Sequence, residues 1–201
     1  MIIIKVIGGL GNQMFQYATA RAIAHRRKVP FKLDISDFAT YEHHEYSLSH
    51  FNIIENVATP PEVMCYKKYL VLLEKFPALI RKVLHKLRLD TALLSYGHYI
   101  LERQFPYCPE IMNIKDDVYL DGYWATEKYF KDIRDVLIKN FSLKVPLKGA
   151  GAELAEQIRS VNNPVCLHIR RGDFANNPEI AKYHGICPME YYYEAAKIIR
   201  D

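Results

Sequence analysis

Residues 2–35 read IIIKVIGGLGNQMFQYATARAIAHRRKVPFKLDI, and this stretch decides the fold. The apolar run at 2–7 is typical of a buried strand, and the glycines of 8–11 indicate a tight turn. A helical spacing of apolar residues follows over 12–28 and ends in cations, which suit a helix C-terminus. Residues 31–35 predict a second strand. Strand, turn, helix and strand make a βαβ unit, whose crossover should be right-handed.

The remaining patterns extend this α/β organisation along the chain. They predict helices over 60–76, 77–89, 127–140, 152–161 and from 188 onward, and strands within 96–105, 118–121 and 165–169. Residues 144–151 hold Pro146, Gly149 and Gly151 and are the best candidate for a linker. The part after this linker has one predicted strand, which cannot form a stable sheet alone. We therefore expect the chain to be truncated relative to a longer two-domain protein.

Composition indicates an ordinary globular protein, with 201 residues of which 50% are apolar and 25% charged. The net charge of +4 helps an anionic nucleotide approach but does not indicate a nucleic-acid partner. Four cysteines without a C-x-x-C spacing predict free, mostly buried thiols and no metal site. We see no charged leader and no apolar stretch of spanning length, so we expect a cytoplasmic protein. The basic helices over 61–89 allow peripheral contact with the inner membrane face, although a solvated helix face is the better-supported alternative.

The glycines after the first strand allow more than one interpretation. Gly9 and Gly11 fit the first two positions of the dinucleotide fingerprint G-x-G-x-x-G, but Met14 occupies the third. Asp34, at the end of the second predicted strand, resembles the ribose-binding acid of that motif. A tight turn without a ligand is the structural alternative. NAD binding by an oxidoreductase therefore stays one hypothesis among several.

Two amides at the start of the predicted helix favour a different ligand. Asn12 and Gln13 can each donate and accept hydrogen bonds, which suits sugar hydroxyls or a phosphate. A helix N-terminus also attracts anions. Asn12 can alternatively cap the helix.

A second motif, HIRRGDF at 168–174, follows the predicted strand over 165–169. Because side chains alternate along a strand, His168 and Arg170 should share a face at its carboxyl end, where ligands bind in open α/β sheets. Arg170 and Arg171 together can form a fork for a diphosphate. Asp173 can hold one arginine in place. The alternative is an Arg–Asp surface pair that closes a turn.

If the two motifs bind a nucleotide-diphosphate sugar, the diphosphate gains negative charge as its bond to the sugar breaks, and this charge must be stabilised. The chain contains no Asp-x-Asp pair of the kind that holds a divalent metal, since Asp116 and Asp117 are adjacent. Arginine is then the remaining cation, and it would act as fixed positive charge aimed at the leaving phosphate.

Three segments in chain order resemble one family. They are GGLGNQMFQYA at 8–18, the H-x-R-R-x-D pattern at 168–173, and DGYWATEKYF at 121–130, which is similar to a G-Y-W-x-[ST]-E-K-Y-F segment. With these segments the chain resembles the bacterial α-1,2-fucosyltransferases of glycosyltransferase family 11. The resemblance implies transfer of L-fucose from GDP-fucose to the 2-OH of a terminal galactoside, with inversion and without a metal or other cofactor.

The resemblance also implies a GT-B-like fold of two Rossmann-type domains. Residues 1–148 would form the acceptor-side domain with a helical insertion, and residues 149–201 would begin the GDP-fucose-binding domain. Arg170 would contact the β-phosphate. The candidate catalytic residues are Arg170 and Asp173; the donor-binding candidates are His168, Arg170, Arg171, Gly9, Gly11, Asn12 and Gln13; the acceptor-side candidates are Tyr123, Trp124 and Asp34.

No residue stands out from the sequence as the base that takes the acceptor proton. Asp34 and Asp173 are both candidates, and the departing phosphate is a third. A truncated, non-catalytic module that binds a glycan or a nucleotide is the alternative to an enzyme.

Overall fold

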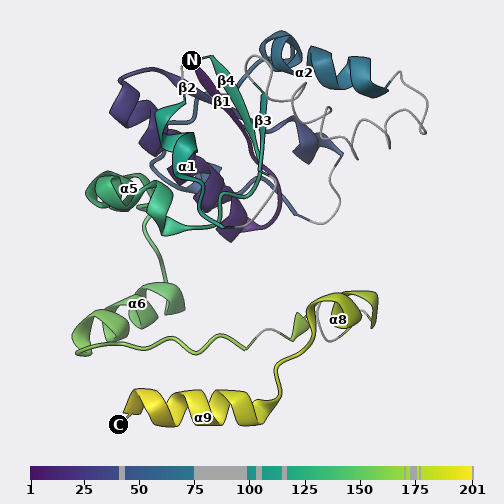
Figure 1. Cartoon of the computed structure of the whole chain (residues 1–201). Helices are drawn as coiled ribbons and strands as arrows, with labels where there is room; N and C mark the ends of the chain where they lie inside the picture. Colours follow the sequence, from purple (N-terminus) through teal and green to yellow (C-terminus); the bar gives the residue numbers. More distant parts are fainter. Residues whose placement is uncertain are drawn as a thin grey trace. The chain divides into compact units, whose positions relative to one another are not determined.

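A computed structural model describes residues 1–40, 44–74, 99–102, 106–114, 117–169, 171–172, 176 and 178–200 (Figure 1). The chain divides into two compact units, Met1–Val145 and Pro146–Asp201. The assignment of residues 1–148 to the acceptor and 149–201 to the donor stays a prediction.

The first unit contains a parallel four-stranded sheet. Its strands are β1 (Ile2–Lys5), β2 (Phe31–Asp34), β3 (Tyr99–Leu101) and β4 (Val118–Asp121). They lie side by side in the order β2-β1-β4-β3, with Ile2 of β1 in register with Phe31 and Val118 (Figure 1). The predicted α/β class is confirmed, as are these four strands. Because all four strands are parallel, the loops that follow them lie at one edge of the sheet.

Helix α1 (Leu10–Arg27) connects β1 to β2 and packs on the sheet. Its Ala18 and Ile23 join Ile2 and Ile4 in one buried core. Burial of each isoleucine contributes roughly 1.5–3 kcal/mol. Lys28 ends the helix in the left-handed conformation, and its N–H donates to carbonyls of the last turn.

The segment predicted as one helix over 127–140 is divided into three pieces. These are η4 (Glu127–Tyr129), η5 (Lys131–Ile133) and α5 (Arg134–Asn140). Phe130 has φ −137° and ψ 11°, which is not helical and separates the first two pieces. Tyr129 and Ile133, on either side of this break, are both buried in the core. Tertiary packing has overridden the local helical pattern.

The remaining elements in the described part of the first unit are one α-helix and three short 3₁₀ turns. They are η1 (Ser36–Ala39), η2 (Leu48–His50), α2 (Pro60–Glu74) and η3 (Pro109–Asn113). Helix α2 begins where the sequence predicted. The predicted helix over 77–89 lies outside the described residues, so membrane contact through 61–89 stays a prediction. Within the described ranges, no helix is long and apolar enough to cross a membrane.

The second unit contains α6 (Ala150–Ser160), α8 (Pro178–His184) and α9 (Met189–Arg200). Residues 164–169 have no regular secondary structure, and Val165 and Leu167 are 63% and 55% exposed. The predicted strand over 165–169 is therefore wrong for this structure. A strand requires a hydrogen-bonded neighbour, and none occurs in the described part of this unit. All four cysteines are free and exposed, so the prediction of mostly buried thiols is also wrong.

Candidate functional site

The N-terminus of α1 lies at the carboxyl end of β1. Gly9 is the N-cap and offers no side-chain cap, and the first turn contains no acidic residue. The first N–H groups of the helix therefore remain available to an anion. A Cβ on Gly11 would meet nothing within 4 Å, so this edge of the loop is open. His44 borders the loop, because a Cβ on Gly9 would lie 3.6 Å from its imidazole.

Asn12 lies in the first turn of α1, so its predicted role as the helix cap is wrong. The side chain is half-buried, and it makes no hydrogen bond to any described residue. Its amide nitrogen lies 2.7 Å from where a Cβ of Gly8 would be, and Gly8 has a φ of +84°. Glycine is therefore required at position 8. Asn12 keeps a free amide beside the open helix terminus, which fits the predicted donor-binding role.

Gln13 has a different use. It is fully buried, and its amide nitrogen donates to the carbonyls of Gly8 and Glu45, each at 2.8 Å. Its Oε1 accepts from the N–H of Ser47 at 2.9 Å. All of these partners are backbone groups of this chain. The structure therefore makes Gln13 a positioning residue that ties the glycine loop to residues 45–47, not an open donor-binding group as predicted.

Gln16, one helical turn later, was missed in the sequence. It is fully buried; its Oε1 accepts from the N–H of Ile7 at 3.0 Å, and its Nε2 donates to the carbonyl of Gly122 at 3.1 Å. It thereby links the loop after β1 to the loop after β4. A second glutamine three residues after Gln13, on the same helix face, is the feature that could have suggested this role.

Asp34 is 2% exposed and belongs to the interior. Its carboxylate accepts from the N–H and hydroxyl of Ser36, from the hydroxyl of Tyr119 at 2.5 Å and from Lys67 Nζ at 3.0 Å. Burial alone would raise the pKa of Asp34, but the bonds from Ser36, Tyr119 and Lys67 together hold it below its usual value. This carboxylate is enclosed and fully paired. It is therefore unsuited to contact an acceptor, to bind a ribose or to serve as a base.

A carboxylate also holds the loop after β4. Glu102, directly after β3, accepts through Oε2 from the N–H groups of Tyr123 and Trp124 at 2.6 and 2.9 Å. Trp124 is 1% exposed, has a φ of +52° and packs edge-on against Tyr129. A positive φ is unusual for a bulky residue, so the loop imposes it. Tyr123, by contrast, is 38% exposed and is available to a ligand.

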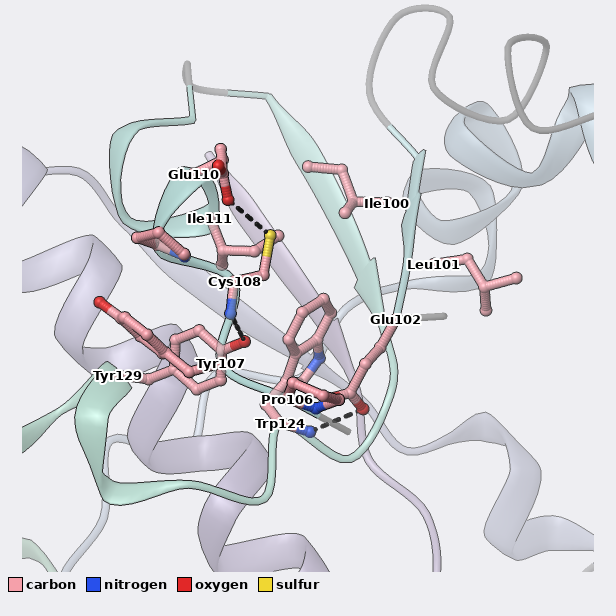
Figure 2. Close-up of a pocket in the computed structure, with 11 residues that line it drawn as sticks. Ile100, Leu101, Glu102, Pro106, Tyr107, Cys108, Glu110, Ile111, Trp124 and Tyr129 are labelled. Atoms are coloured by element: carbon pink, nitrogen blue, oxygen red, sulfur yellow. Dashed lines mark hydrogen bonds between the residues drawn. The ribbon is translucent and has the colours of Figure 1, made fainter. Parts of the chain in front are cut away.

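A cavity of about 430 Å³ lies next to this loop (Figure 2). Its lining comes from the end of β3, from residues 106–111 and from Trp124 and Tyr129. Tyr107 and Tyr129 form a tilted aromatic pair with ring centroids 4.9 Å apart. The Tyr129 hydroxyl accepts from the N–H of Cys108 at 2.9 Å, which fixes this wall. The cavity was not predicted, because only the folded structure brings residues 100–102 and 106–111 against Trp124 and Tyr129.

The second predicted motif is only partly described. His168 is exposed, and Arg171 is half-buried and donates to the carbonyl of Cys187 at 3.0 Å. Arg170 and Asp173 lie outside the described residues. Because residues 164–169 do not form a strand, the predicted common strand face of His168 and Arg170 has no support here. Their roles stay predictions. In the described ranges, no cluster of His, Cys, Asp and Glu has the geometry to hold a metal ion.

Comparison with known protein families identifies the family of this chain. The model of Glycosyl transferase family 11 matches residues 1–201. The chain belongs to glycosyl transferase family 11. This membership removes the basis for the dinucleotide oxidoreductase hypothesis, which rested on Gly9, Gly11 and Asp34 alone.

Two relatives of this family 11 chain come from Escherichia coli. It is 29% identical over 204 residues to an alpha-1,2-colitosyltransferase, an alignment that covers 100% of this chain and 64% of the relative. It is also 29% identical over 214 residues to the O-antigen biosynthesis glycosyltransferase WbnK, with coverages of 96% and 66%. The chain thus spans 64% and 66% of the lengths of these relatives. No solved structure matches it.

Proposed function

We propose that the protein is a galactoside α-1,2-fucosyltransferase, which transfers L-fucose from GDP-fucose to the 2-OH of a terminal galactoside. The observation that carries this proposal is the family 11 match over residues 1–201. The fucosyl specificity rests on the resemblance of the three motifs to α-1,2-fucosyltransferases. A GT-B-like arrangement of two Rossmann-type domains, with the donor held by the second, is part of the proposal.

The donor is bound by two groups of residues in this account. The open N-terminus of α1, with Gly9, Gly11 and Asn12, offers N–H groups and one amide to a phosphate or a sugar hydroxyl. The guanidinium groups of Arg170 and Arg171 supply the charge that the diphosphate requires. His168 adds a further donor.

The reaction is an inverting displacement at the fucose anomeric carbon. The bond from this carbon to the β-phosphate oxygen breaks, and its electrons leave with GDP. A new bond forms to O2 of the galactoside, whose proton passes to a base. Fixed arginine charge stabilises the leaving diphosphate without a metal. Because Asp34 is buried and fully paired, Asp173 and the departing phosphate remain the candidates from the sequence. His44, whose imidazole lies close to Gly9, is a further candidate.

A transfer assay with defined linkage tests the proposal. The complete protein is incubated with GDP-fucose and methyl β-galactoside, and the product is examined by NMR. We expect an α-linked fucose on O2 and GDP in equal amount. Fucose on another hydroxyl, or no disaccharide while the protein remains folded, would contradict the proposal.

A second candidate donor follows from the similarity to the alpha-1,2-colitosyltransferase. The same assay with a nucleotide-activated colitose separates the two. If colitose is transferred and fucose is not, the enzyme is a colitosyltransferase, and only the donor assignment changes.

A further inference from the structure

Two residues that line the cavity beside Trp124 each carry a buried polar atom with no partner in the described structure. The Glu102 Oε1 and Trp124 Nε1 atoms are both buried, and neither makes a hydrogen bond within the described structure. Both residues line the cavity, and the indole nitrogen lies on the side of the ring that faces Glu102 (Figure 2). A buried polar group without a partner destabilises the fold. Two such atoms on neighbouring lining residues leave one acceptor and one donor for a ligand to pair.

The chemistry of these atoms is complementary. Glu102 Oε1 is an acceptor, and Trp124 Nε1–H is a donor. A sugar hydroxyl donates one hydrogen bond and accepts others, so one hydroxyl placed between these atoms satisfies both. The walls suit the rest of a sugar ring, because Tyr107 and Pro106 offer aromatic and aliphatic surface to its C–H face.

The arrangement is rigid. The second carboxylate oxygen of Glu102 accepts the N–H groups of Tyr123 and Trp124, which fixes Oε1 in direction. Gly122 permits this approach, since a Cβ there would lie 2.3 Å from Glu102 Cβ and 3.1 Å from Trp124 Cε2. The cavity volume of about 430 Å³ falls within the range of small-molecule sites.

We propose that this cavity binds one pyranose ring of the acceptor glycan, with a ring hydroxyl between Glu102 Oε1 and Trp124 Nε1. The identity of the sugar as part of an acceptor rests on the proposed function. The nucleotide is assigned to the N-terminus of α1 and to residues 168–173, and neither group lines this cavity.

The single tryptophan of the chain makes the test direct, since Trp124 lines this cavity and its emission responds to changes there. Methyl β-galactoside is titrated into the 201-residue chain, and GDP is titrated separately. We expect a saturable change in emission with a millimolar dissociation constant for the galactoside, and none for GDP. No response to galactoside, or a response to GDP alone, overturns the proposal.

A matched pair of variants locates the effect. Glu102→Gln keeps an oxygen for the two backbone N–H groups but replaces the free acceptor with a donor, and we expect galactoside binding to weaken about tenfold or more. Glu153→Gln changes an exposed carboxylate of α6 and should leave binding unchanged. Circular dichroism verifies that both variants are folded. Equal affinity in folded Glu102→Gln and in the wild type overturns the proposal.

The outcome is separable from that of the proposed function. Fucose transfer without a galactoside response at Trp124 would remove the cavity from the acceptor site and leave the enzyme assignment in place. Galactoside binding that depends on Glu102, without transfer from either donor, would contradict the proposed function and leave the sugar site.

Discussion

Replacement of Gln16 by leucine tests whether the glutamine links the loops after β1 and β4. Leucine has a similar size but leaves the N–H of Ile7 and the carbonyl of Gly122 without their bonds of 3.0 and 3.1 Å. Each lost partner costs about 1–3 kcal/mol, and burial of the leucine returns roughly 1–2 kcal/mol. We therefore expect Gln16→Leu to lower the free energy of unfolding by about 1–4 kcal/mol.

Thr19 provides a matched control on the same helix. It is fully buried like Gln16, but its hydroxyl makes no hydrogen bond in the described structure. Thr19→Val removes a polar atom without breaking a bond, so stability should stay equal or rise by about 1 kcal/mol.

Urea unfolding followed by Trp124 fluorescence measures both variants in the first unit. With a slope of about 2 kcal/mol/M, Gln16→Leu should lower the midpoint by roughly 0.5–2 M, whereas Thr19→Val should not lower it. If Gln16→Leu unfolds within about 0.5 kcal/mol of the wild type, the linking role is refuted.

Three further predictions concern the residues around the site. The pKa of Asp34 lies below its usual value of 3.8 in the folded state, so its stabilising contribution is present above that pH and is lost as the pH falls through the folded pKa. The urea midpoint of Asp34→Asn should therefore fall less steeply below about pH 4 than the midpoint of the wild type. Equal pH dependence of the two midpoints would contradict the pairing. Gly122→Ala should destabilise the first unit by about 2 kcal/mol or more, since its Cβ would meet Glu102 at 2.3 Å, and a wild-type melting temperature would be inconsistent with this contact. Gly11→Ala, where nothing lies within 4 Å of a new Cβ, should keep or raise stability by up to about 1 kcal/mol while it impairs GDP-fucose turnover; normal turnover would remove the α1 N-terminus from the donor site.

The sequence predicts the first βαβ unit well because its patterns are local. The apolar run from Ile2, the glycine loop and the cations before Phe31 each constrain one element independently of the rest of the chain. The same holds for β4 at Val118 and for the start of α2 at Pro60.

The wrong sequence predictions share one cause, because each concerned a feature that depends on tertiary contacts. Residues 165–169 alternate like a strand but have no neighbouring strand in their described unit, and Phe130 breaks a helical pattern so that Tyr129 and Ile133 both reach the core. Gln13 was predicted to bind a ligand because its structural role could not be read from the sequence. Two of its three backbone partners, Glu45 and Ser47, are distant in the sequence. Glu102 was indistinguishable from a surface acid until the loop after β4 was placed beside it.

The central claim, that arginine replaces a metal in fucose transfer, is tested most directly by turnover in excess EDTA. Formation of the fucosylated galactoside is measured for the wild type, for Arg170→Ala and for Arg159→Ala, which alters an exposed arginine of α6. We predict full activity with EDTA for the wild type and Arg159→Ala, and a loss of about 100-fold or more for folded Arg170→Ala. Turnover that stops in EDTA and returns with Mn²⁺ or Mg²⁺, or that survives in Arg170→Ala, would contradict the claim.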